Sequence, residues 1–444
     1  MRYSWRKGIL CAWLGWAILF LLSRPALAEE ELLPAPGKPI NLEQCLAIAL
    51  KYHPTLQASL AAVEASKARI EQALANYYPQ VSLNTAYSNS TYNVFGAGPF
   101  FFGKTYNWTF YDYYTVGPTL TQNIYDFGRT PNTVKINREN TKASEQDLIT
   151  TKQTVVFNVK QAYFGVIQAL RIVGVAEETV RQIQEHLNQA RAFLRAGTVP
   201  EIDVSQAEVD LATAELALIR ARNGFQIAQV TLNNAMGLQE SLSFPIEDTL
   251  EFKKLEITLE EILRAAYERR PEILQLKARQ LGQEATVKVA QASYYPILSG
   301  NATYVYHGIH AYELYWDLTV GATLTIPIFS GFSSPNQVAE AKANLKNLKA
   351  QEEATRQNVR LEGEQAYLLL KEAEEGVRVT EKGLAQAEKK YGLATGRYNA
   401  GVGSPLEVTD AEVSLANARV DYIQSLVGYK IAEARIEKAM GLVR

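Results

Sequence analysis

Two periodicities alternate along the chain, and each predicts one kind of secondary structure. In four segments apolar residues alternate with small polar ones at a period of two, which is typical of β-strands that have one apolar face. Such strands are expected at residues 80–95, 108–126, 297–308 and 315–328. Elsewhere apolar residues recur at alternate spacings of three and four, which predicts helices that pack as coiled coils. The longest of these helices are expected at residues 131–196, 201–237, 333–399 and 405–441.

Shorter helices complete the pattern, and the helix lengths predict an arrangement. The short helices are expected at residues 41–53, 54–79, 258–270 and 271–294. A helix over residues 131–196 would be about 100 Å long. Helices 54–79 and 201–237 together approach that length, so we expect two short helices stacked end to end beside one long helix. Residues 241–257 would then form an equatorial linker halfway along the long helix.

The chain contains one unit written twice, which we place at residues 40–240 and 258–442. The motif Tyr-Tyr-Pro at Tyr77–Pro79 recurs 217 positions later, at Tyr294–Pro296. The motif Ala-Met-Gly-Leu near residue 237 recurs 204 positions later. The change of offset localises an insertion to the segment between the two strands of the first unit. A fixed offset over more than a hundred residues indicates an internal two-fold sequence repeat.

The alternation in the strands favours one face toward lipid and the other toward water. The residues expected to face lipid are Val81, Leu83, Leu120, Ile124, Trp316, Leu318, Val320 and Leu324. A half-buried soluble hairpin would show the same alternation and stays open as an alternative. Four strands cannot close a barrel, so strands in lipid would require an oligomer. The aromatic insertion at residues 92–114 fits either an interfacial girdle with an outer loop or a folded hydrophobic cap.

The amino terminus has the order of a secretory signal. Arg2, Arg6 and Lys7 precede an apolar stretch, and Ala26–Ala28 follows it. We therefore expect residues 1–28 to be a signal peptide and residues 29–39 to be an extended lead. The apolar core is shorter than the roughly 20 residues of a spanning helix, and a retained membrane anchor is the alternative.

Composition and the missing motifs exclude several functions. The chain has 444 residues, with 45 Lys plus Arg against 47 Asp plus Glu, so it has no basic excess for a nucleic-acid partner. A mean hydropathy of -0.14 excludes a polytopic helical membrane protein. The sequence shows no paired catalytic acids, no nucleophile with its base and no cofactor motif, so we expect neither an enzyme nor a cofactor. His307 and His310 lack a third ligand, so no metal site is predicted.

Two Gly-to-Pro segments predict tight hairpins between successive long helices, because Gly ends a helix in the left-handed conformation and Pro begins the next one. The hairpin residues are Gly197, Thr198, Val199, Pro200, Gly401, Val402, Gly403, Ser404 and Pro405. Acidic residues follow each hairpin, namely Asp203 in the first repeat and Glu407 and Asp410 in the second. The helix macrodipole favours acidic residues in a first turn, which is an alternative reason for Asp203 and Glu407.

The duplicated order, the Tyr-Tyr-Pro motifs before the strands, the strand-to-helix returns at Ile124–Arg129 and Ile328–Gly331, and the Ala-Met-Gly-Leu endings resemble the TolC-like outer membrane efflux proteins. The resemblance implies an α+β membrane protein that is a homotrimer. Four strands per chain would form a twelve-stranded transmembrane β-barrel, and the helices would form a long coiled-coil periplasmic tube.

The function that this resemblance implies is a passive exit duct for small molecules in the outer membrane. Its partners would be a periplasmic adaptor, which docks at the hairpin tips, and through it an inner-membrane pump of the RND, ABC or MFS type. Two alternatives stay open: the outer component of a type I protein secretion system, and, from a different class, a periplasmic coiled-coil adaptor or scaffold.

The resemblance also implies a gate at the hairpin tips. It assigns Glu407 and Asp410 the place of the aspartates whose rings narrow the closed entrance, and it assigns Asp203 and Tyr398 to polar positions in the gate's hydrogen bonding. Three copies meeting on an axis would form a like-charged ring that attracts cations. Well-studied members carry an arginine where this chain has Gly403, so we expect the closed state to be held more weakly or by other contacts.

Overall fold

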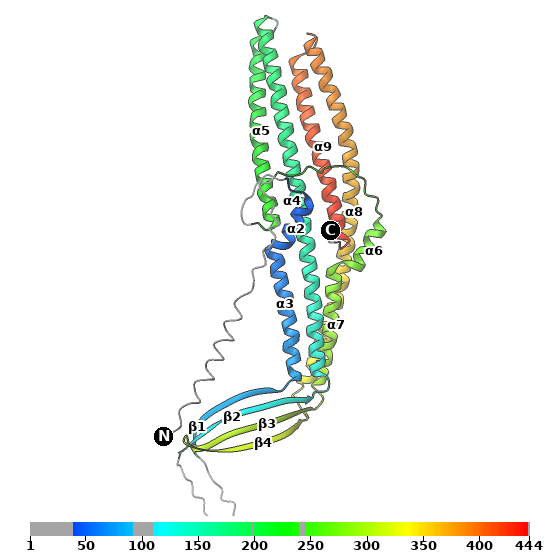
Figure 1. The fold of residues 1–444 in the computed structure, drawn as a ribbon. Helices are drawn as coiled ribbons and strands as arrows, with labels where there is room; N and C mark the ends of the chain where they lie inside the picture. Colours follow the sequence, from blue (N-terminus) through cyan, green and yellow to red (C-terminus); the bar gives the residue numbers. More distant parts are fainter. Residues whose placement is uncertain (1–38, 92–109, 198, 239–244, 443–444) are drawn as a thin grey trace, which may run out of the picture.

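The computed structural model describes residues 39–91, 110–197, 199–238 and 245–442. The expected signal peptide, nearly all of the extended lead, most of the aromatic insertion and Thr198 lie outside the described residues. The described part is an elongated array of helices with a curved four-stranded sheet at one end and two helical hairpins at the other (Figure 1). No described helix contains an apolar stretch that could span a membrane.

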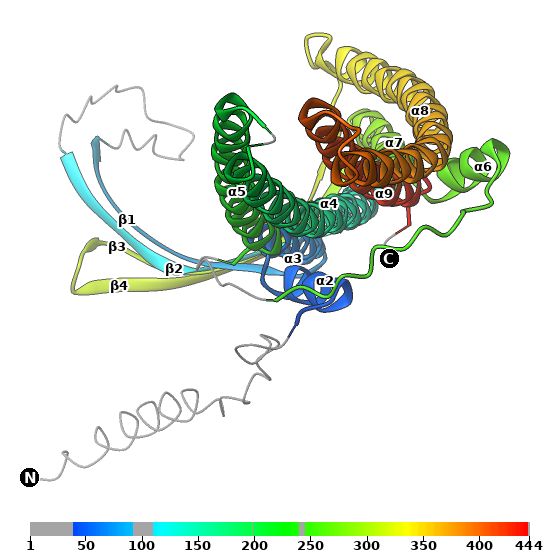
Figure 2. The same ribbon diagram turned by 90° about the horizontal axis from the view of Figure 1, so that it is seen from above.

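Two helices, α4 and α8, run the whole length of the array and have 67 residues each. Shorter helices pack beside them, and α2 and α6 lie at mid-height (Figure 1). The helices are α2 (Leu42–Tyr52), α3 (Pro54–Leu74), α4 (Arg129–Arg195), α5 (Glu201–Met236), α6 (Leu259–Arg269), α7 (Pro271–Ala292), α8 (Ser333–Asn399) and α9 (Pro405–Ala439). Seen along the array, they form an arc with α5 near one end and α8 near the other (Figure 2).

The short helices stack end to end beside the long ones, as their lengths predict. Helices α5 and α3 both pack along α4, while α9 and α7 lie between α4 and α8. At the first junction Gly237 has φ of 77°, and a Cβ there would lie 2.7 Å from His53 Cα. At the second, Gly441 has φ of 78°, and a Cβ would lie 2.9 Å from the carbonyl carbon of Arg269. Each stacked pair therefore meets at a glycine that approaches backbone closely.

The sheet consists of β1 (Gln80–Thr91), β2 (Phe110–Tyr125), β3 (Ile297–His310) and β4 (Glu313–Thr325), in that order and antiparallel throughout. Its register places Val81 opposite Leu120, Leu120 opposite Ala302, and Ala302 opposite Val320. Because directly opposed residues share a face, one apolar face extends across all four strands. Thr, Ser and Asn residues alternate onto the other face.

The eight residues expected to face lipid lie on the apolar face, and all except the partly buried Leu120 are exposed in the single chain. Ile124 reaches this face in an unexpected way. The register shifts between Asn123 and Tyr125, which is a β-bulge, and Ile124 Cδ1 lies 3.2 Å from where a Cβ on Gly300 would be. The bulge thus lays Ile124 over a glycine of the next strand.

Several element ends differ from the expected ones. Strand β4 ends at Thr325, before Pro327, which lacks the N–H that a ladder needs. Strand β3 continues to His310, and β4 begins at Glu313, because their pairing extends further into the hairpin than expected. Helix α3 ends at Leu74 and is followed by a 3₁₀ turn at Ala75–Tyr77. Tyr78 is extended, because a residue directly before proline disfavours the α conformation.

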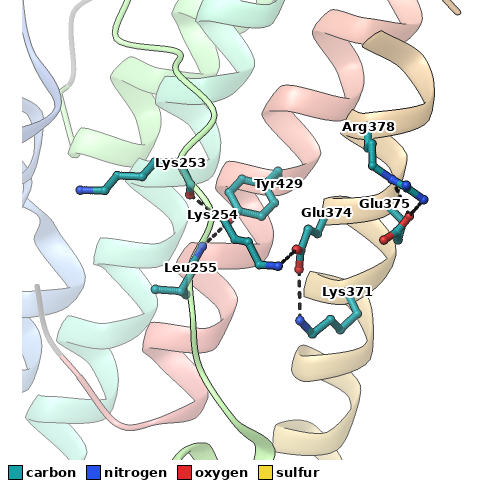
Figure 3. Close-up of polar contacts among 8 residues, drawn as sticks. All are labelled: Lys253, Lys254, Leu255, Lys371, Glu374, Glu375, Arg378 and Tyr429. Atoms are coloured by element: carbon teal, nitrogen blue, oxygen red, sulfur yellow. Dashed lines mark hydrogen bonds and ion pairs between the residues drawn. The ribbon is translucent and has the colours of Figure 1, made fainter. Parts of the chain in front are cut away.

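The largest apolar cluster lies at mid-height, where α2, α6 and the linker cover the long helices. Two buried tyrosines hold the linker. The hydroxyl of Tyr163 donates to the Glu247 carbonyl at 2.7 Å. The hydroxyl of Tyr429 accepts from Leu255 N at 2.7 Å and donates to the Lys253 carbonyl at 3.0 Å (Figure 3).

An ion pair adds to this attachment, since Lys254 Nζ lies 2.7 Å from Glu374 Oε1 on α8, and Lys371 binds the other carboxylate oxygen at 3.1 Å (Figure 3). The linker is therefore attached to α9 and α8 through both its backbone and its side chains.

We expect Tyr429→Phe to loosen the linker locally by about 1–3 kcal/mol, because it leaves the Leu255 N–H and the Lys253 carbonyl without their partner. Tryptic cleavage after Lys253 and Lys254 should become faster in the folded protein. Tyr422→Phe on the same helix is the matched control, because the Tyr422 hydroxyl makes no hydrogen bond within the described residues. Equal cleavage of the two variants would contradict the role of the Tyr429 hydroxyl.

Candidate functional site

The two helical hairpins form the end of the molecule that lies farthest from the sheet (Figure 1). In each, a glycine adopts a left-handed conformation just after the long helix, with φ of 74° at Gly197 and 73° at Gly401. Pro200 is the N-cap of α5 and Pro405 the first residue of α9. The Ser404 side chain caps α9 by accepting from Glu407 N at 3.4 Å. These features match the hairpin pattern in the sequence.

Gly403 is closely packed rather than an empty place for an arginine. A Cβ there would lie 2.8 Å from the Tyr398 nitrogen, and Gly403 N donates to the Arg397 carbonyl at 3.0 Å. The hairpin instead has an arginine at Arg397, in the last turn of α8. Its Nε atom lies 3.3 Å from Glu407 Oε2. The second hairpin therefore contains an Arg397–Glu407 ion pair, which was not predicted from the sequence.

Glu407 and Asp410 lie one turn apart at the start of α9 and are both exposed. The Asp410 carboxylate has no ion-pair partner among the described residues. Its backbone carbonyl accepts from Ser414 Oγ at 2.6 Å and from Lys390 Nζ at 3.4 Å. Of these two acidic residues, one is therefore paired within the chain and the other is free to face a neighbouring copy or solvent.

Tyr398 lies inside the bundle, against rings from α4. Its ring centroid is 5.1 Å from that of His186 and 5.6 Å from that of Phe193. Its hydroxyl is buried and makes no hydrogen bond within the described residues. Burial, assisted by the nearby Asp203 carboxylate, raises the pKa of Tyr398. In this structure Asp203 therefore acts on Tyr398 through its charge rather than through a hydrogen bond.

The same hairpin end holds a buried carboxyl group that was not predicted from the sequence. Glu412 on α9 is only 4% exposed, and burial together with the charge of Asp210 raises its pKa to about 7. Thr409 Oγ1, one turn earlier, donates to Asp210 Oδ2 across the two hairpins at 3.4 Å. Burial lowers the pKa of His186, while Asp210 and Asp203 oppose that shift. We call His186, Asp210, Tyr398, Thr409 and Glu412 the hairpin polar cluster; Asp210 and Thr409 are partly buried and the other three are buried.

The sequence signal for this cluster was weak but present. Glu412 directly follows Ala411, a position in the apolar seam of α9, and His186 directly precedes the seam residue Leu187 of α4. A charged or polar residue beside a seam can be buried by a second neighbouring helix. Which of them is buried depends on the contact between hairpins.

Within the described residues no group of three or more His, Cys, Asp or Glu could hold a metal ion. His307 stacks on Tyr113, with 6.1 Å between ring centroids, and His310 stacks on Tyr312 at 5.2 Å. The two histidines thus contribute to an aromatic end of the sheet.

A family model described as "Outer membrane efflux protein" matches residues 46–238 and 262–442 of the chain. The chain belongs to this family. This chain is 24% identical over 404 residues to the outer membrane efflux protein BepC of Brucella suis, covering 90% of this chain and 85% of that one. It is 23% identical over 421 residues to the outer membrane protein TolC of Escherichia coli, covering 90% and 82%.

Solved structures show the same fold at lower identity. A membrane protein from Pseudomonas aeruginosa superposes on this chain with a TM-score of 0.78, at 21% identity and over 90% of each chain. The outer membrane protein VceC of Vibrio cholerae superposes with a TM-score of 0.76, at 19% identity and over 91% of this chain and 97% of that one. The arrangement of stacked helices above a small sheet is therefore that of known outer membrane channels.

These findings confirm the TolC-like resemblance and the expected location. This chain is an outer membrane protein and an outer component of an efflux system. The family consists of transport components rather than enzymes. A periplasmic scaffold, the alternative from a different class, does not fit membership of an outer membrane family.

Proposed function

We propose that the chain is the outer membrane exit duct of a tripartite efflux system, closed as a homotrimer and driven by an inner-membrane pump through a periplasmic adaptor. The observation that carries the proposal is the position of two features at opposite ends of one continuous helical array. One end holds a sheet with an apolar face, and the other holds hairpin tips with exposed carboxylates (Figure 1). A duct that crosses lipid at one end and admits cargo at the other needs both.

Exposed apolar residues at the two ends of the helical arc support a trimer. On α5, Ile202, Val209 and Leu216 recur every seven residues and are exposed. On α8, Leu361 and Leu368 have the same spacing and are also exposed. Both helices lie near the ends of the arc (Figure 2). A heptad seam without a partner in its own chain is completed by a helix of another copy.

The sheet supports the same assembly. A four-stranded sheet has two free edges and cannot close, whereas three copies supply twelve strands, which is enough for a barrel with an aqueous interior. The apolar face would contact outer membrane lipid, and the Thr, Ser and Asn face would line the water-filled duct.

The adaptor contact is proposed at the hairpin tips, where Val402 and Leu406 are exposed apolar residues beside the acidic ones. Small molecules or ions are the proposed cargo. Relatives of similar identity are named for antibiotic efflux in Pseudomonas putida and for cation efflux in Escherichia coli. No described residue favours a protein cargo over these.

Planar-bilayer conductance of the purified protein tests the duct and its gate. We expect the wild-type trimer to give small steps that divalent cations block from the tip side. Because the block requires a ring of carboxylates, the double variant Glu407→Gln and Asp410→Asn should lose it and conduct several-fold more. Glu201→Gln, an exposed acidic residue in the first turn of α5, is the matched control and should keep the block.

If the block is unchanged in the double variant, the constriction does not lie at Glu407 and Asp410, but the proposal of a duct stands. No steps from a protein that inserts into the bilayer would overturn the duct itself.

A further inference from the structure

The turns between strand and long helix are unusual in both repeats, because each contains two successive left-handed residues. In the first repeat these are Phe127 and Gly128, with φ of 52° and 88°. In the second they are Gly331 and Phe332, with φ of 60° and 66°. Phe127 and Phe332 are the positive-φ residues other than glycine within the described part of the chain. A phenylalanine in this conformation costs free energy and persists where contacts of its side chain hold it.

In the first repeat the structure shows what holds the ring. Phe127 stacks on Tyr295, with 5.3 Å between centroids and 9° between planes, and it meets Tyr125 edge-on at 4.7 Å. Tyr295 belongs to the Tyr-Tyr-Pro motif that precedes β3. The strand-to-helix turn of the first repeat therefore docks on the strand start of the second repeat.

In the second repeat the offset of 204 residues places Gly331 at the position of Phe127 and Phe332 at that of Gly128. The ring therefore comes one residue later in the turn, and it has no such partner. Phe332 meets Phe329 edge-on at 5.6 Å, as Phe127 meets Tyr125, but no further ring contact occurs among the described residues. Ile328 is 95% exposed, Phe329 76% and Phe332 69%. These residues follow β4, which is one free edge of the sheet.

The residues that match Tyr294 and Tyr295 in the first repeat are Tyr77 and Tyr78, which directly precede β1 at the other free edge of the sheet. Both are exposed in the single chain. One edge therefore carries rings that lack the contact seen inside the chain, and the opposite edge carries the tyrosines that would make it.

We propose that Phe329 and Phe332 of one copy dock on Tyr77 and Tyr78 of a second copy of this chain. In this aromatic clasp Phe332, one residue after the position that matches Phe127, would make between chains a contact like that of Phe127 with Tyr295 within one chain. The proposal rests on the homotrimer of the proposed function and names the surface by which its copies meet where the sheet joins the helices.

The internal repeat also supplies the strand register of this interface. Inside the chain β2 of the first repeat pairs with β3 of the second, and Thr119 lies opposite Thr303. The equivalent residues are Thr323 on β4 and Ala86 on β1. Thr323 of one copy should therefore lie opposite Ala86 of the next, with both side chains on the polar face.

The same transfer applies to the segment that follows β4. Tyr125 pairs with Leu298 inside the chain, and the equivalent residues are Phe329 and Val81. Residues 326–329 are unpaired in the single chain. Phe329 of one copy should therefore lie opposite Val81 of the next, which brings its ring next to Tyr78 of that copy.

Disulfide cross-linking of the full-length protein in outer membranes tests the register. Oxidation of the double variant Thr323→Cys and Ala86→Cys should give covalent dimers and trimers on a non-reducing gel, since opposed strand residues lie within disulfide range. Thr323→Cys with Ser82→Cys, on the same face but displaced along β1, should give at most about one tenth of that yield. Thr119→Cys with Thr303→Cys should close within one chain and leave the monomer mass unchanged. The native Cys45 is buried, so it can stay.

Phe332→Gly tests the clasp itself. Glycine relieves the backbone strain at this φ, so the variant stabilises the trimer if the ring has no partner. If the clasp exists, losing the ring should make heat dissociation of the trimer about tenfold faster. Tyr78→Ala should have a similar effect, and the double variant should be no worse than either single one. Tyr312→Ala, an exposed ring in the β3–β4 hairpin, is the control and should change nothing.

Unchanged or slower dissociation of Phe332→Gly would overturn the clasp, even if trimers form. Cross-linking that favours the displaced pair would overturn the register. A wild-type protein that shows no trimer before any substitution would instead overturn the homotrimer, and with it the proposed duct.

Discussion

Gly237→Ala is expected to destabilise the folded protein by about 3 kcal/mol or more, and Gly441→Ala by a similar amount. Two costs add at these positions. Each residue has φ near 77°, where a Cβ is strained by about 1–2 kcal/mol. In addition, the new Cβ would lie 2.7 Å from His53 Cα or 2.9 Å from the Arg269 carbonyl carbon, so one stacked helix must shift along the other. Thermal unfolding of the purified protein measures the loss.

The hairpin glycines provide a matched control for this prediction. Gly197 and Gly401 have φ of 74° and 73°, but a Cβ at either meets nothing within 4 Å. Alanine there should cost the conformational strain alone, about 1–2 kcal/mol. Equal losses at all four glycines would show that the helix junctions are not closely packed.

Glu412→Gln is expected to remove a pH dependence from the hairpin end. The carboxyl pKa rises from 4.5 to about 7, so the folded protein holds this proton more tightly than the unfolded chain does. Its contribution to stability is therefore complete below about pH 4.5 and is lost as pH rises to about 7. The loss is on the order of 1–3 kcal/mol. At pH 8 the glutamine variant should be more stable than wild type by that amount, and near pH 4 the two should be equal.

The groups around Glu412 modify this profile in known directions. Asp210 raises its pKa, so Asp210→Asn should move the pH window downward. His186 has a lowered pKa, so it contributes stability above its usual pKa and loses it as pH falls. Tyr391 on α8 is influenced by the charge of Glu412 and by those of Glu185 and Glu178 on α4. Asp203 on α5 acts on both Tyr398 and His186.

Hydrogen exchange of peptides from residues 405–420, corrected for the intrinsic effect of pH, measures the stability of this end. Glu215→Gln is the control, because Glu215 is an exposed acidic residue on α5 without a partner in the described chain. A wild-type profile that coincides with that of Glu412→Gln would show that the buried carboxyl does not titrate in this range.

The helices, strands and hairpins could be predicted from the sequence because each depends on residues that are near neighbours along the chain. The spacing of apolar residues determines whether a segment is a strand or a helix. Gly401 and Pro405 determine where a long helix stops and the next one begins. The offsets of 217 and 204 residues predict an internal repeat. The helix lengths indicated that α3 and α5 stack beside α4.

The candidate site was predictable in part. Glu407 and Asp410 could be named as candidates because acidic residues follow a recognisable hairpin, and their role in a gate stays a prediction. The Arg397–Glu407 pair could have been inferred, since ten positions across a tight hairpin bring both residues to the same level. Glu412 could not be inferred, because its burial depends on how the α4–α5 hairpin packs against α8 and α9.

The sequence by itself therefore determined the order and type of the elements and the positions of the hairpins, all of which arise from local backbone preference and periodicity. Only the tertiary structure decided the close backbone contact at Gly237 and Gly441, the bulge at Ile124, the burial of Glu412 and the stacking of Phe127 on Tyr295. These features join residues that are far apart in the chain. Their geometry follows from the way that whole helices and strands pack, which no local pattern encodes.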